Sequence, residues 1–298
     1  MERSETQRRN SETIIRHFTQ LTAATTWQCV DEVKLAFRTY HPQGLVKINE
    51  SFYLSSVEIV VPRKKFAVPQ DGYDRSPGEG IGYLFQFDAT GQLVKTLTLG
   101  EGSIYHPGGI DYDGEYIWIP VAEYRPNSRS IIYRVNPETL EVSEMFRHND
   151  HIGGLACNRW NGTLHGISWG SRKFYAWKSA DGRDWKERQH EPECTMCANG
   201  SHYIDYQDCH FLEDKYMLCS GLSNYMLPTI SPVALGGLEL IDLDLHIAIH
   251  QVPVLLYTHT MRPMTQNPFS VELYHDHLRF YFIPDDNKSI LYIYDVRR

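Results

Sequence analysis

Histidine and glutamate recur in this sequence at matched spacing, and these side-chain types suit acid–base chemistry. The segment HPQGLVKINESFYLSSVE runs from His41 to Glu58, and HPGGIDYDGEYIWIPVAE runs over the same length from His106 to Glu123. A third copy, HIGGLACNRWNGTLHGISWG, begins at His151. An imidazole beside a carboxylate can move protons near neutral pH. These five residues are therefore our candidate catalytic residues.

The same segments also form a structural repeat. Each reads as two short apolar strands around a polar turn, which predicts a β-hairpin. Degenerate fourth and fifth copies begin at Asp205 and Thr265, and each copy is followed by a second hairpin or, at the C-terminus, by half of one. Four strands per unit, repeated around a ring, is the pattern of a β-propeller. The five repeated segments predict an all-β fold with five blades, with a sixth blade in residues 191–206 as the alternative.

Both ends of the chain are expected to close this ring. The last half-unit, ILYIYDV, lacks an outer strand, and WQCVDEVKLAF near the N-terminus can supply it. Ser11 followed by Ile14, Ile15, Phe18 and Leu21 predicts a capped amphipathic helix within an N-terminal extension of residues 1–25. The sequence thus predicts one propeller domain over residues 1–298.

Hairpin geometry predicts where a binding site lies. The first residue of an inner strand and the last residue of the next strand are neighbours, so each His/Glu pair should meet at the channel mouth. Long loops over residues 59–80, 123–130, 169–172 and 222–232 leave the same face, and such loops usually carry binding or catalysis. We expect the walls of this pocket to contain aromatic, Met, Arg and Gln side chains that bind substrate: Tyr124, Arg125, Trp169, Arg172, Gln207, Tyr225, Met226, Gln266 and Phe269.

Other interpretations of these residues stay open. The His-x-x-Gly repeat can be structural, because glycine permits a tight turn and histidine can bond backbone carbonyls. Three symmetry-related histidines could bind a metal, but whole blades separate them, so no metal is expected. Cys194-x-x-Cys197 resembles half a zinc site, and whether these cysteines bind metal or form a disulfide is open.

Composition and charge exclude several classes of protein. The chain of 298 residues has no apolar run near the roughly 20 residues that a membrane span needs, so no membrane partner is expected. Its formal charge of -8 and the absence of a basic cluster exclude a nucleic-acid partner. The N-terminus has no apolar signal region, which predicts a cytoplasmic protein. No phosphate-binding glycine loop or GxSxG is present, so neither a nucleotide cofactor nor a serine hydrolase is indicated.

Several segments resemble a known family. GLVKINESFYLSSVE, DGYDRSPGEGIGYLFQFD, LGEGSIYHPGGIDYDGEYIWIPVAEYRPNSRSIIYRV and HGISWGSRKFYAW are similar to small β-propeller proteins, and in particular to the fungal hetero-Diels–Alderases of tropolonic sesquiterpene biosynthesis. The resemblance runs from about residue 41 to residue 210 and rests on overall similarity rather than on a catalytic signature.

The resemblance implies a cofactor-free pericyclase with two small-molecule substrates. It would join a tropolone o-quinone methide to a humulene-type macrocyclic alkene and form a dihydropyran ring. In that reaction His/Glu pairs would serve as acid and base, Arg125 and Arg172 would bind the tropolone, and the aromatic and Met side chains would shape the terpene slot. A propeller hydrolase or lactonase using Glu58 and Glu123 is the alternative, and a non-catalytic interaction propeller is a third hypothesis.

Overall fold

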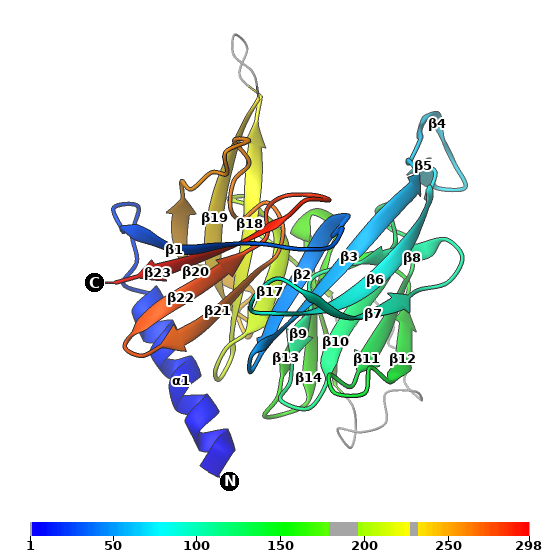
Figure 1. Cartoon of the computed structure of the whole chain (residues 1–298). Helices are drawn as coiled ribbons and strands as arrows, with labels where there is room; N and C mark the ends of the chain where they lie inside the picture. Colours follow the sequence, from blue (N-terminus) through cyan, green and yellow to red (C-terminus); the bar gives the residue numbers. More distant parts are fainter. Residues whose placement is uncertain (1, 179–195, 227–231, 298) are drawn as a thin grey trace.

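A ring of five β-sheets forms the body of the computed structural model, which describes residues 2–178, 196–226 and 232–297 (Figure 1). Burial explains which segments take which place in this ring. The inner strands are covered on both faces and are almost continuously buried, whereas the outermost strands alternate or are largely exposed. The all-β propeller with five blades is thereby confirmed.

Each blade is an antiparallel sheet whose first strand lies nearest the central axis. The first blade contains β2 (His41–Ile48), β3 (Ser51–Val61), β6 (Glu79–Asp88) and β7 (Leu93–Leu99). The second contains β8 (Ile104–Pro107), β9 (Asp111–Tyr112), β10 (Ile117–Glu123), β11 (Ser130–Val135) and β12 (Val142–His148). The third contains β13 (Ile152–Asn158), β14 (Thr163–Ser168), the 3-10 helix η1 (Trp169–Ser171), β15 (Lys173–Lys178) and β16 (Met196–Ala198).

The last two blades complete the ring. The fourth contains β17 (Asp205–Phe211), β18 (Tyr216–Tyr225), β19 (Val233–Asp242) and β20 (Ile247–Val254). The fifth contains β21 (Phe269–Tyr274), β22 (His277–Phe282), β23 (Ile290–Val296) and, as its outer strand, β1 (Trp27–Lys34). Because β1 pairs with β23, the N-terminal segment supplies the strand that the C-terminal half-unit lacks, as predicted.

The third blade differs from its sequence prediction. Its outer strand was expected in the hairpin that begins at Phe174, but the predicted second strand of that hairpin lies outside the described residues. Instead β16 pairs with β15, from Lys173 with Ala198 to Tyr175 with Met196. Residues of the interval proposed for a sixth blade thus complete the third one.

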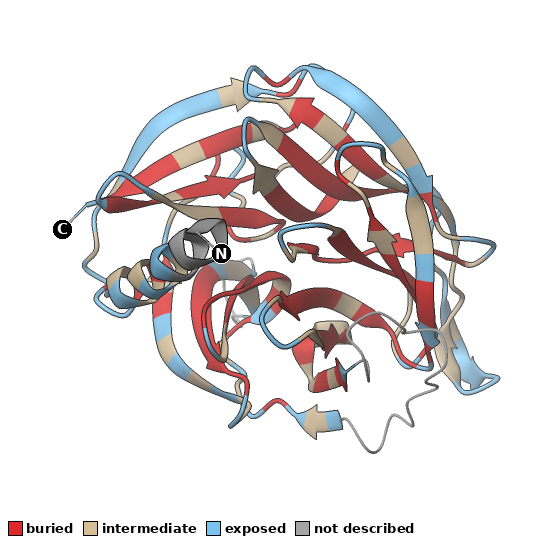
Figure 2. Ribbon diagram, turned by 90° about the horizontal axis from the view of Figure 1, so that it is seen from below, coloured by how far each residue is buried: buried red, intermediate tan, exposed pale blue. Residues whose placement is uncertain are grey.

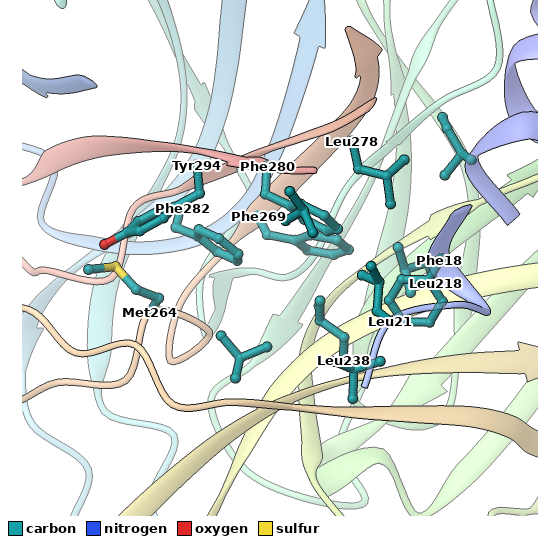
Figure 3. Close-up of a cluster of buried hydrophobic side chains, with 14 of the residues drawn as sticks. Phe18, Leu21, Leu218, Leu238, Met264, Phe269, Leu278, Phe280, Phe282 and Tyr294 are labelled. Carbon is teal, nitrogen blue, oxygen red and sulfur yellow. The ribbon is translucent and has the colours of Figure 1, made fainter. Parts of the chain in front are cut away.

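The N-terminal helix lies on the lower face of the ring. α1 (Glu2–Phe18) begins well before Ser11, so the predicted helix is right and its predicted start is wrong. Figure 2 views the ring from below, with α1 lying across this face. Phe18 and Leu21 are buried against Leu218 and Leu238 of the fourth blade (Figure 3). No described helix is long and apolar enough to cross a bilayer.

Glycines let the inner strands approach the axis closely. A Cβ on Gly44 would lie 2.5 Å from the Ile110 nitrogen, and one on Gly109 would lie 2.6 Å from Oδ1 of Asp208. Neither glycine has a positive φ. The His-x-x-Gly repeat therefore reflects close backbone packing, and its interpretation as a tight turn is wrong for these glycines.

Two buried carboxylates tie the inner strands together at the axis. Asp208 accepts backbone N–H groups of β2, the second blade, β17 and β21, from Leu45, Ile110, Cys209 and Phe269. Asp111 accepts those of β13 and β17, from Cys157 and Phe211. Every blade thus donates to one of these two side chains, which we call the axial carboxylates. They lie where the inner strands of the five blades meet.

Two long hairpins rise from the face opposite α1, the upper face in Figure 1. One is the extension of β3 and β6 that carries β4 (Lys65–Gln70) and β5 (Tyr73–Arg75), which we call the flap. The other is formed by β18 and β19. Strands β2 and β13 start at this face, so the repeated histidines lie at its centre.

Candidate functional site

Three histidines from three neighbouring blades gather at the upper mouth of the channel. The ring centroids of His41 and His106 are 6.5 Å apart, and those of His106 and His151 are 5.9 Å apart. His106 and His151 are buried, and His41 is partly exposed. Each lies near the start of the inner strand of its blade, so the repeat itself brings them together. We call this group the histidine cluster.

Hydrogen bonds fix the orientation of two of these rings. Nδ1 of His41 lies 2.8 Å from Oδ1 of Asp286, and Nδ1 of His151 lies 2.8 Å from the Glu123 carbonyl oxygen. A carbonyl can only accept, so Nδ1 of His151 carries the proton. Both nitrogens of His106, by contrast, are buried and have no hydrogen-bond partner among the described residues.

Burial keeps the inner histidines neutral. It lowers the pKa of His151 to about 4 and, together with the nearby His151, His41 and Arg63, lowers the pKa of His106 well below its usual value. At neutral pH these two side chains are therefore uncharged. Neither is an imidazolium acid.

An aromatic stack covers the histidine cluster. The Tyr124 ring lies on His106 with a centroid distance of 4.0 Å and an interplanar angle of 18°. The guanidinium of Arg63 lies on the other face of this ring, its Cζ 3.5 Å from the centroid. Trp169 contacts His151 edge-on at 4.8 Å and lies 5.7 Å from Tyr124. The predicted binding residues Tyr124 and Trp169 thus lie at the site.

Glu123 anchors the rim of this site. Its carboxylate is fully buried and accepts hydrogen bonds from Ser103, Arg125 and Arg129 at 2.7 to 2.8 Å. Burial raises its pKa, but these donors outweigh burial and lower it. Arg125 in turn lies 3.4 Å above the ring of Tyr73 in the flap. Glu123 and the predicted binding residue Arg125 therefore hold the flap against the second blade.

A hollow of about 340 Å³ opens beside the stack. Among the residues that line it are His41, Glu58 and Tyr124, and the His41 ring bonds to Asp286 rather than to Glu58. His41 pairs with Val57 across the hairpin, one position before Glu58. Glu58 accepts a hydrogen bond of 3.1 Å from Tyr83; burial and this bond raise the pKa of Tyr83 to about 12.

Asp286 links His41 to the fifth blade. Burial raises the pKa of Asp286, but the hydrogen bonds from His41 and Arg262 outweigh this effect and lower it to about 2. A permanent negative charge therefore orients the His41 ring from outside the cluster.

The remaining predicted binding residues lie further from the cluster. Arg172 bonds to Gly170, Ser201 and Asp205 in the rim between the third and fourth blades, and Gln207 bonds weakly to Asp205. Tyr225 and Met226 are exposed at the tip of β18, and Gln266 is half-buried before β21. Phe269 belongs to the hydrophobic core and is not part of the rim.

Sequence reasoning missed the flap residues and Asp286. Arg63, Tyr73 and Arg75 lie in the long insertion between β3 and β6, which has no counterpart in the repeat. Their signal was the presence of cationic and aromatic side chains in that long insertion. The axial carboxylates were also missed; Asp208 lies in the mixed polar strand DYQDCHF and Asp111 in the two-residue strand β9.

The described part of the chain contains no group of three or more His, Cys, Asp or Glu side chains arranged to hold a metal ion. Cys197 is a free thiol, whereas Cys194 lies outside the described residues. Whether Cys194 and Cys197 bind a metal or form a disulfide therefore stays open.

The fold and the family of this chain follow from comparison with other proteins. A hypothetical protein from Leishmania major is 11% identical, with a TM-score of 0.52 over 89% of this chain and 90% of that one. MPT-4, a mannose phosphorylase from Leishmania mexicana, is 10% identical, with a TM-score of 0.54 over 89% and 88%. These likenesses concern the fold alone, and no curated protein matches the sequence. The profile of one family matches residues 8–297, and the chain belongs to that family, the family of unknown function DUF6454.

Proposed function

We propose that this protein is a cofactor-independent hetero-Diels–Alderase acting at the upper mouth of the propeller channel. Its substrates would be a hydroxymethyl tropolone, the source of the o-quinone methide, and a humulene-type alkene. The observation that carries the proposal is the pair of neutral, buried histidines, His106 and His151, beneath a stack of flat side chains. Such a site can orient a planar conjugated molecule and accept a proton from it.

Neutral histidines suit the step that precedes the cycloaddition. Loss of water from the hydroxymethyl tropolone removes the ring O–H proton and expels the hydroxyl group. The bare imidazole nitrogen of His106 can accept that proton while its other nitrogen donates a proton to the departing hydroxyl, so that water leaves and the imidazole stays neutral as its other tautomer. This relay needs no imidazolium, whose charge burial disfavours at His106.

The cycloaddition itself needs orientation more than charge. The oxygen and carbon termini of the quinone methide each form one bond to the alkene, and no proton is exchanged. Exposed apolar side chains on the same face offer surface to a hydrocarbon partner: Ile59, Val60, Val61, Val68, Tyr225 and Met226. Holding both partners face to face supplies the effective concentration that accelerates such a reaction.

The hydrolase alternative has less support. In that hypothesis Glu58 and Glu123 are the two catalytic carboxyl groups. Both oxygens of Glu123, however, already accept hydrogen bonds from Arg or Ser side chains. A glycosidase-type reaction needs one protonated and one ionised carboxyl group on either side of the bond to be broken. The donors that lower the pKa of Glu123 disfavour the protonated role.

A product assay tests the proposal. EDTA-treated full-length protein is incubated with a hydroxymethyl tropolone and a hydroxylated humulene, and the products are separated by chiral chromatography beside an enzyme-free control. We expect a single stereoisomer formed faster than in the control. A racemic product at the control rate would refute the proposal, and lactones and glycosides with added calcium and zinc would then be screened.

A further inference from the structure

The Tyr124 ring is held on both faces. Arg63 lies 3.5 Å from one face, and His106 is stacked at 4.0 Å on the other. A flat conjugated ring is the shape that such a sandwich accepts, and a cation above it favours an electron-rich ring.

The Tyr124 ring does not hydrogen-bond to the buried polar atoms around it. Nη1 of Arg63 and both nitrogens of His106 are buried without a hydrogen-bond partner among the described residues. Buried polar atoms in this state favour a ligand that can bond to them.

The backbone on either side of Tyr124 is fixed. Glu123 is buried under its three donors, and Arg125 is bonded to Glu123 and stacked on Tyr73. The backbone of Arg63 is restrained as well, since its neighbour Lys64 exchanges two hydrogen bonds with Ser76. Rotation of its side chain is thus the motion open to Tyr124, and the hollow of about 340 Å³ that it lines gives the ring space.

We propose that Tyr124 occupies the slot of the ligand, and that a planar conjugated ring with hydroxyl or carbonyl oxygens at its edge displaces it from between Arg63 and His106. The bound ring stacks on both side chains, and its edge oxygens lie within reach of Nη1 of Arg63 and the nitrogens of His106. This inference deepens the proposed function and rests on it only for the location of the site.

Binding without turnover tests this inference. The probe is tropolone, a flat oxygenated ring, with saturated 2-hydroxycycloheptanone as the non-planar control, and affinities are measured by calorimetry. The Tyr124→Ala variant, whose slot is open, is expected to bind tropolone at least about tenfold more tightly than wild type, because tropolone no longer has to displace the Tyr124 ring from between Arg63 and His106. Tyr124→Phe keeps an aromatic ring in the slot and should bind tropolone as wild type does.

Two further variants locate the effect. Arg63→Gln is expected to weaken tropolone binding at least about tenfold, because it removes the cation above the ring. Tyr274→Ala is the matched control: Tyr274 is likewise stacked under an arginine, with Cζ of Arg279 at 3.4 Å, but it lies at the far end of β21. This control should leave the affinity unchanged, and circular dichroism checks the fold of every variant.

The outcomes separate this inference from the proposed function. Tropolone binding that is unchanged or weaker in folded Tyr124→Ala, or equal affinity for the saturated ring, would overturn the inference even if wild type performs the cycloaddition. Tighter binding by Tyr124→Ala together with loss in Arg63→Gln would support it even if no cycloaddition product is found, in which case only the proposed function fails.

Discussion

At the scale of single residues, the site depends on keeping histidines neutral in a buried place. Burial lowers the pKa of both His106 and His151, while a backbone carbonyl orients His151 and a carboxylate orients His41. A proton acceptor that stays unprotonated over a wide pH range follows from this arrangement.

The first prediction concerns the pH profile of turnover. Burial depresses the pKa of His151 to about 4, so this group remains neutral from pH 8 down to pH 5. We expect the steady-state rate of cycloadduct formation to vary less than about twofold over that range, once corrected for the uncatalysed rate. A sharp loss of rate with a midpoint near pH 6.5, the value of an ordinary histidine, would contradict the neutral cluster.

Glu123 carries the second prediction. Because its buried carboxylate balances Arg125 and Arg129, Glu123→Gln is expected to destabilise the fold by about 2 to 4 kcal/mol. The exposed pair of Glu144 and Arg147 gives the control, and Glu144→Gln should cost less than about 1 kcal/mol. Urea unfolding of both variants measures the difference. Equal stabilities would show that Glu123 does not anchor the rim.

The histidine cluster was predictable from the sequence, and the aromatic stack that lies over it was not. His41, His106 and His151 head repeated segments, so symmetry alone places them around the axis. Arg63 reaches Tyr124 from an insertion without a repeat, and only the folded flap brings it there. Phe269 shows the reverse error: its repeat position is right, but its side chain turns into the core.

At the scale of elements, packing of inner strands around the axis explains the repeated glycine. The third prediction is that Gly109→Ala destabilises the protein by at least about 2 kcal/mol, because the new methyl group would meet Oδ1 and Cα of Asp208. For a domain of this size the melting temperature should fall by roughly 4 °C or more. A methyl group added at Gly200 would meet no described neighbour within 4 Å, so Gly200→Ala should melt as wild type does.

The strands themselves were largely readable from alternating hairpin signals, with one exception. In the third blade the strand predicted to follow β15 lies outside the described residues, and β15 pairs with β16, which the hairpin signals did not indicate.

At the scale of the whole molecule, the axial carboxylates and β1 hold the ring closed. Burial raises the pKa of Asp208 to about 7, although the His210 charge and backbone donors act in the opposite direction. Burial by itself lowers the pKa of His210, but Asp111 and Asp208 outweigh it and raise the pKa to about 9. His210 is therefore charged at neutral pH and shared between the two carboxylates.

The fourth prediction is a loss of stability in mildly alkaline solution. The folded pKa of His210 is above its unfolded value of about 6.5, so its stabilisation is complete below that pH and disappears as pH rises through 9. We expect the free energy of unfolding to fall by on the order of 2 to 3 kcal/mol across this window. His210→Gln should remove that slope, and an unchanged slope in this variant would assign it to other groups.

The measurement that tests the central claim most directly compares one residue at each mouth of the channel. His106 lies at the upper mouth, and Lys47, paired with Glu272, lines a hollow of about 320 Å³ at the lower mouth. The rate and stereochemistry of cycloadduct formation are measured for His106→Gln and Lys47→Gln beside wild type. The account predicts at least about a tenfold loss of rate in folded His106→Gln, in the range that a general base contributes, and a wild-type rate in Lys47→Gln. A wild-type rate in His106→Gln, or a loss in Lys47→Gln alone, would contradict it.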